Sequence, residues 1–138
     1  MNKVQGSNYF LLVINGVSGI WALFFPHEFH TSFPGFGFHW IDIYGPYNEH
    51  LIRDVGAFFC GLTSLSVFAI LDSDIKTVRL MAYSNLVFST PHFVYHFAHM
   101  HMFPTALDRF LGISSLFLVA FIPGLILFWT SMRPARIF

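Results

Sequence analysis

The chain has 138 residues, of which 55% are hydrophobic and 10% charged, and its net charge is zero with neutral histidines. A soluble domain carries about 25% charged residues, so these few charges cannot cover a water-facing surface, and lipid is expected to surround much of it. The balanced charge argues against a nucleic-acid partner, which would require a basic patch. The length suits a single domain, residues 1–138.

The first predicted membrane span covers residues 9–25. An apolar run after Lys3 also resembles a signal peptide, but it ends in bulky residues before Pro26 and has no small-x-small cleavage site. We therefore expect it to be retained as a helix. Gly16, Gly19 and Ala22 give this helix a small face that suits close packing in lipid.

Residues 26–48 are predicted to form a long outer loop. The segment is rich in histidine, phenylalanine, proline and glycine and contains no lysine or arginine. Pro34, Gly35 and Gly37 favour turns. Trp40 and the two tyrosines of the segment are typical anchors at a membrane interface.

The second predicted span, 49–71, opens on ionisable side chains, and Asn48 is expected to cap it. Glu49 and Arg53 are four residues apart, as are His50 and Asp54, so each pair can interact on one helix face. Because charges are costly in a membrane, such residues normally face the bundle interior and pair. We expect Arg53 to form a structural ion pair with Glu49 or Asp54.

The third predicted span, 78–98, follows a polar turn in which Asp74 is expected to cap the helix. Polar residues recur on one face of this helix: Asn85, Ser89, His92, His96 and His99. Pro91 lies within it and predicts a kink. The fourth predicted span is 108–130, with a second kink at Pro123-Gly124.

The fold class is therefore an all-α, four-helix transmembrane bundle with a long outer loop between helices 1 and 2. Basic residues favour the cytoplasmic side. Five of the seven lie on the side of the two termini: Lys3, Lys76, Arg79, Arg133 and Arg136. Both termini are thus predicted to be cytoplasmic, which places all eight histidines in the outer half or the outer loops.

The histidine pattern predicts a metal site. Two histidines one helical turn apart, as in His92-x3-His96, can hold one ion. Imidazoles suit zinc, copper and iron, and carboxylates can complete the coordination. The predicted ligands are His50, His92, His96, His99, Glu49 and Asp54, with Tyr95 and Asn85 as outer partners. Haem is a variant, with histidines from two helices as axial ligands.

Two strings, YGPYNEHLIRDVG and PHFVYH, resemble sequences of small, uncharacterised four-span bacterial membrane proteins, which are similar to DoxX-like proteins. The resemblance covers residues 26–101. It implies a four-helix membrane fold in a bacterial inner membrane. It implies no known activity, so no catalytic residue follows from it.

Three functions fit these observations. The leading hypothesis is a membrane protein with an outward-facing His/Glu/Asp site that binds a transition metal or redox cofactor. The first alternative is a non-enzymatic subunit of a membrane complex, or a carrier, whose polar cluster only holds the helices together. The second is a lipid-modifying enzyme in which a His/Glu pair performs acid–base chemistry. The bilayer is the expected partner, together with a second copy or another membrane protein.

Overall fold

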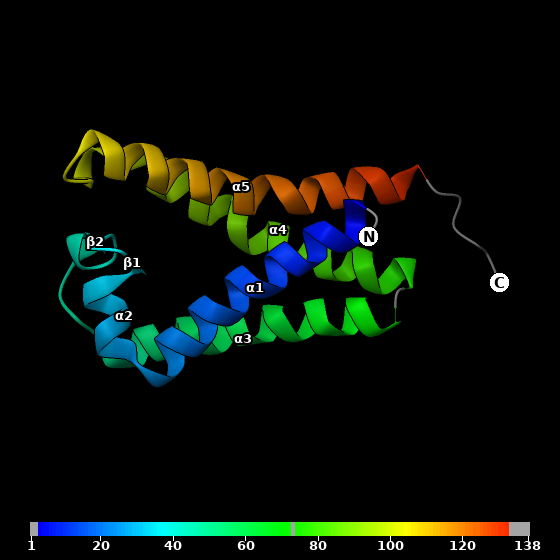
Figure 1. Ribbon diagram of the computed structural model, residues 1–138, viewed down its shortest axis with the longest axis horizontal. Helices are drawn as coiled ribbons and strands as arrows, with labels where there is room; N and C mark the ends of the chain where they lie inside the picture. Colours follow the sequence, from blue (N-terminus) through cyan, green and yellow to red (C-terminus); the bar gives the residue numbers. More distant parts are fainter. Residues whose placement is uncertain (1–2, 73, 133–138) are drawn as a thin grey trace.

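The computed structural model describes residues 3–72 and 74–132, and these are mostly helical. The long helices are α1 (Lys3–Phe24), α3 (Glu49–Asp72), α4 (Ile75–Ala98) and α5 (Ala106–Ser131). The start of α1, the adjoining ends of α3 and α4, and the end of α5 lie together at one end of the molecule (Figure 1). The predicted all-α class is confirmed.

Three of the described helices, α1, α3 and α5, are long and apolar enough to cross a membrane. At about 1.5 Å per residue, the 22 residues of α1 extend over roughly 33 Å, close to the ~30 Å hydrocarbon thickness of a bilayer. Helix α4 has 24 residues but carries the polar stripe, which lowers its hydropathy. The chain therefore has the character of a membrane protein.

Side-chain caps fix the starts of three helices. The Asp74 carboxylate accepts from Lys76 N at 3.0 Å, and Asn48 Oδ1 accepts from Leu51 N at 3.1 Å. Both caps were predicted from the sequence. Thr105 Oγ1 accepts from Asp108 N at 3.1 Å and starts α5. Each cap satisfies a backbone N–H that the helix leaves unpaired.

The helices pack as two pairs, α1 with α3 and α4 with α5. Small residues bring α1 and α3 close together, since a Cβ atom added to Gly56 would lie 2.5 Å from Leu23 N. A Cβ atom added to Gly19 would likewise lie close to the backbone of Cys60. An apolar cluster then joins the two pairs: Leu11, Ala69, Val78, Met81, Ala82 and Ile126.

The segment between α1 and α3 is more ordered than predicted. Residues 26–48 contain α2 (Pro26–Ser32), the antiparallel strands β1 (Pro34–Gly35) and β2 (Phe38–His39), and the 3₁₀ turn η1 (Asp42–Tyr44). The prediction of a plain loop was wrong for this part. Proline is favoured at the first helical position, and Phe29 anchors α2 by packing edge-on against Trp21 at 5.8 Å.

The interior of the molecule is unusually polar. Nearly as many polar as apolar side chains are buried, the polar ones being Asn8, Asn15, Ser18, His30, Ser66, Asn85, Ser89, His96, Asp108 and Thr130. Large apolar side chains meanwhile cover much of the exposed surface, including Val17, Phe68, Val87 and Phe110. This distribution fits lipid as the outer solvent, because in lipid polar groups find their partners inside the protein.

Candidate functional site

The polar stripe of α4 faces the interior, as its spacing predicts. Asn85, Ser89 and His96 are 1%, 3% and 9% exposed, and His92 is half-buried. The apolar residues between them point outward, for example Val87 and Val94. The stripe therefore lines the inside of the bundle along the C-terminal half of α4.

The inner end of the stripe is held by amide hydrogen bonds. Asn15 Nδ2 donates to Asn85 Oδ1 at 2.8 Å and so joins α1 to α4. Asn85 Nδ2 donates in turn to Met81 O at 2.9 Å. One turn further out, the buried Ser89 Oγ has no hydrogen-bond partner within the described chain.

The two central histidines lie side by side. The ring centroids of His92 and His96 are 4.5 Å apart and the ring planes meet at 70°. His92 also stacks on Phe88, with centroids 5.2 Å apart, and Phe88 contacts Phe58 and Phe59 of α3. Within residues 3–72 and 74–132 the His92 ring makes these aromatic contacts and no hydrogen bond. Its ring nitrogens are thus available.

Tyr44 of η1 covers His96. Its hydroxyl lies 2.8 Å from His96 Nδ1, and its ring packs edge-on against the imidazole at 4.7 Å. Burial, and then the nearby Tyr95, raises the pKa of Tyr44 above its ordinary value. The phenol consequently stays protonated and can donate to His96 or accept from it. Sequence reasoning missed Tyr44, because no spacing links residues 52 positions apart.

A second contact holds the covering segment in place. Trp40 Nε1 donates to Asp108 Oδ1 at 3.0 Å, and the Trp40 ring packs edge-on against Phe103 at 5.9 Å. The Asp108 carboxylate also accepts from the Thr105 hydroxyl. Residues 40–44 are therefore fastened to the start of α5 and contact His96 near the C-terminal end of α4.

The predicted acidic ligands lie elsewhere. His50 Nδ1 is 3.4 Å from Asp54 Oδ2, and these side chains are 89% and 63% exposed. Arg53 Nε is 2.8 Å from Glu49 Oε1, the partner that its spacing predicts, and Arg53 also donates to the Leu23 carbonyl of α1. These pairs are satisfied locally at the start of α3, so nothing draws them toward α4.

The six predicted ligands are thus not gathered around one point. Among the described residues there is no group of three or more His, Cys, Asp or Glu side chains that could hold a metal ion. The interior pair, His92 and His96, is brought together. His99 lies at the end of α4, where its ring stacks on Tyr95 with centroids 4.2 Å apart.

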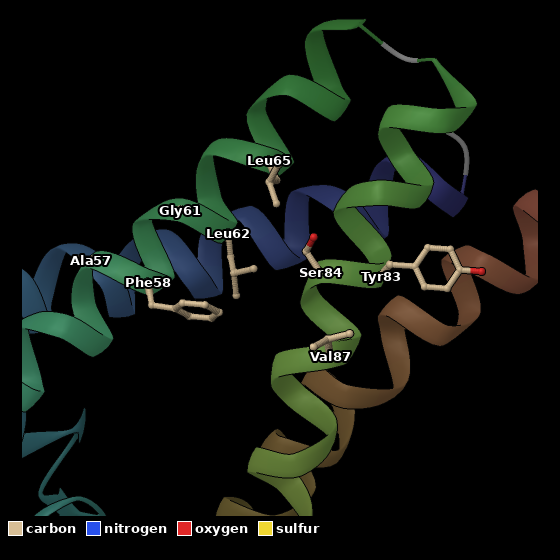
Figure 2. Close-up of a pocket in the computed structure, with 8 residues that line it drawn as sticks. All are labelled: Ala57, Phe58, Gly61, Leu62, Leu65, Tyr83, Ser84 and Val87. Carbon is tan, nitrogen blue, oxygen red and sulfur yellow. The ribbon is translucent and has the colours of Figure 1, made fainter.

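An apolar groove lies between α3 and α4. Its volume is about 680 Å³ and its lining is Ala57, Phe58, Gly61, Leu62, Leu65, Tyr83, Ser84 and Val87. Figure 2 shows α3 and α4 diverging, with Phe58, Leu62 and Leu65 on one side and Val87 and Ser84 on the other. Phe58 touches Phe88, which stacks on His92, so these two phenylalanine rings stand between the groove and the imidazole pair.

Comparisons with protein-family models, with curated proteins and with solved structures found no match. The resemblance to DoxX-like proteins therefore stays a prediction.

Proposed function

We propose that this chain is an integral protein of a bacterial inner membrane that binds a transition-metal ion through His92 and His96. The observation that supports this proposal most is the pair of inward-facing imidazoles 4.5 Å apart. Ionisable side chains inside a membrane, histidine included, are costly and normally mark a functional site. The His92 imidazole makes no hydrogen bond in the described chain. A role in holding the helices together by hydrogen bonds therefore does not explain why a polar side chain lies at this position.

The proposal includes α4 as a fourth membrane span. The exposed side of α4 is largely apolar, with Leu80, Val87, Val94 and Phe97 more than half exposed, while the polar stripe is turned inward. Such a helix suits lipid on its outer side even though its mean hydropathy is low. With four spans the basic ends of the bundle are cytoplasmic, and the histidine pair lies in the outer half.

The residues fit a metal ion in specific ways. Histidines one turn apart on a helix can grip a single ion, and imidazoles suit zinc, copper and iron. His96 would bind through Nε2 while Nδ1–H donates to Tyr44, the outer hydrogen bond that orients metal-binding histidines. Both rings leave the same face of one helix, so together they fit one ion better than the two opposite axial positions of a haem.

Two imidazoles leave coordination positions open. An open position is what separates a catalytic metal site from a closed structural one. A further ligand would approach His92 from the side of the α3–α4 groove, past Phe58 and Phe88. The pair thus suits binding of an exchangeable ligand or redox chemistry at the membrane.

Metal analysis tests the proposal. Protein purified in detergent without a histidine tag should carry a transition metal, or bind zinc, copper or iron on titration. The His92→Ala/His96→Ala variant should hold about one equivalent less, whereas the control His27→Ala should match the wild type. A wild type that binds none of these metals, or a folded double variant that binds as much as the wild type, contradicts the proposal.

A second candidate function follows from the groove. The groove opens between two proposed spans, so the hydrocarbon chain of a membrane lipid is its proposed occupant, and the protein would act as a carrier. A Cβ atom at Gly61 would meet nothing within 4 Å, so Gly61→Leu should fill the groove without distorting α3. Mass spectrometry of the detergent-purified protein should then show less bound lipid than in Gly61→Ala; equal lipid in both removes this candidate.

A further inference from the structure

We infer that the turn between α4 and α5 is a copper(I) site formed by His99, His101 and Met102. Residues 99–102 read His-Met-His-Met. Thioether sulfur selects copper(I), and imidazole also suits copper. The inference stands on these residues and does not require the His92/His96 site.

The backbone of the turn brings two of the ligands, His99 and Met102, within one hydrogen-bonded turn. Residues Met100–Met102 form the 3₁₀ turn η2, and Met102 N donates to His99 O at 2.9 Å. In 3₁₀ geometry the side chains of residues i and i+3 eclipse each other. Met102 thus follows His99 by one such turn along the backbone, and both side chains are half-buried.

The spacing of the imidazoles suits one shared ion. An imidazole nitrogen lies about 1.1 Å from its ring centroid, and metal–nitrogen bonds measure about 2.0–2.1 Å. Two rings on one ion thus have centroids at most about 6.3 Å apart. The His99 and His101 centroids are 6.1 Å apart, which is within that reach. His101 is exposed, so an ion can arrive from outside.

The hydrogen bonding of His99 favours the same role. Its Nδ1 lies 2.7 Å from the Tyr95 carbonyl. A carbonyl accepts only, so Nδ1 carries the proton and Nε2 keeps its lone pair in the neutral ring. This is the outer hydrogen bond that metal-binding histidines usually make, and it fixes both tautomer and ring orientation. Stacking on Tyr95 adds to that orientation.

The position of the turn suggests how the site would be used. His99 lies one helical turn beyond His96 on the stripe that also carries His92, so the turn is the outer end of a row of imidazoles. If the interior pair takes copper, the turn would be the place where the ion is first captured.

Anaerobic copper(I) titration against a chromophoric copper(I) chelator tests the inference. The protein should be tag-free, in detergent, and carry His92→Ala/His96→Ala so that the interior pair does not contribute. We expect one copper(I) with a sulfur neighbour in its X-ray absorption spectrum. Met102→Leu and His101→Gln should weaken binding by at least the roughly tenfold that loss of an outer partner costs.

Two controls accompany this titration. His39→Gln and Met132→Leu change the same residue types elsewhere and should leave binding unchanged. If the double-alanine background does not fold, Met102→Leu in the otherwise native chain should lose one copper(I) equivalent. Copper(I) binding that is unaffected by both Met102→Leu and His101→Gln overturns the inference, whatever the interior pair does.

Discussion

The hydrogen bond from Asn15 Nδ2 to Asn85 Oδ1 joins two helices from different pairs deep inside the bundle. Both side chains are 1% exposed, so neither can turn to water if its partner is removed. A buried donor left unpaired costs about 1–3 kcal/mol, whereas replacing both partners by apolar groups of similar shape can be nearly neutral. The two asparagines are therefore energetically coupled.

Asn85→Leu should lower the free energy of unfolding in detergent by about 1–3 kcal/mol, because it leaves Asn15 without its acceptor. Asn15→Leu/Asn85→Leu should recover part of that loss. Melting temperatures of the two single variants and the double variant measure the coupling. Additive effects of the two substitutions would show that the amides do not interact in the folded protein.

Tyr44→Phe should weaken metal binding at the interior pair by about 10–100-fold, the usual effect of removing an outer hydrogen-bond partner. Tyr95→Phe is the matched control, since the Tyr95 ring also packs against His96, at 5.5 Å, but its hydroxyl makes no hydrogen bond within the described chain. Isothermal titration with the metal identified by elemental analysis provides the measurement. Equal affinities in the two variants would mean that the Tyr44 hydroxyl does not orient His96.

For single residues, the sequence predicts the contacts that depend on helical spacing. The inward stripe of α4 and the pairing of Arg53 with Glu49 both follow from intervals of three or four residues. Contacts between distant segments, such as Tyr44 with His96 or Trp40 with Asp108, have no such signal. Glu49 and Asp54 were predicted to join the interior histidines, because charged side chains in a membrane need partners. In the structure each carboxylate instead pairs with a neighbour on α3.

Among the helices, α1 and α3 approach most closely, and glycine makes this possible. The position of Gly56 is decisive, since a Cβ atom there would lie within 2.9 Å of backbone atoms of Ala22 and Leu23. Backbone cannot move aside as a flexible side chain can. Gly61, five residues along the same helix, has nothing within 4 Å.

Gly56→Ala should destabilise the protein by about 1–3 kcal/mol, the usual cost of overpacking a close contact. Gly61→Ala should be neutral or stabilising by up to about 1 kcal/mol, because alanine is the better helix former. Thermal melts of the two variants in the same detergent measure the stability effect of the same substitution at two positions of one helix. If the Gly56→Ala protein is as stable as the Gly61→Ala protein, α1 and α3 are further apart at Gly56 than the structure shows.

The four long helices were predicted from hydropathy and capping residues. The start of α1 and the presence of α2 were not predicted, and each has a physical reason. Helix α1 begins at Lys3 instead of residue 9, because Asn8 is buried and donates to Ser66 O at 3.3 Å. The polar residue Asn8 near the start of the chain thus makes a contact in the interior. Helix α2 has only seven residues, too few for helical periodicity, and its aromatic packing depends on contacts made elsewhere.

The whole molecule presents a polar interior and an apolar exterior, with its loops and turns at two ends. The β1–β2 hairpin lies at the end of the molecule opposite the adjoining ends of α3 and α4 (Figure 1), and Phe36 between its strands is 98% exposed. The proposed four spans place these two ends on opposite sides of the membrane. The basic residues then put the α3–α4 turn inside.

Single cysteines test this orientation in a Cys60→Ser background. Phe36→Cys should react with a membrane-impermeant maleimide from outside in right-side-out vesicles, and Asp74→Cys should react only after the membrane is opened. Both sites are exposed in the folded protein, so reactivity reports on the side of the membrane. Labelling of both cysteines from the same side would rule out the proposed crossing of the membrane by α3, the long helix between the two sites.

X-ray absorption at the edge of the bound metal tests the central claim most directly. Tag-free protein with Met102→Leu/His101→Gln, loaded with the ion identified by elemental analysis, isolates the interior pair from the turn. Our account predicts two imidazole nitrogens at about 2.0–2.1 Å, with the multiple scattering typical of histidine rings, and their loss in a folded protein that also carries His92→Ala/His96→Ala. A spectrum without imidazole, or one unchanged by loss of both histidines, would contradict it.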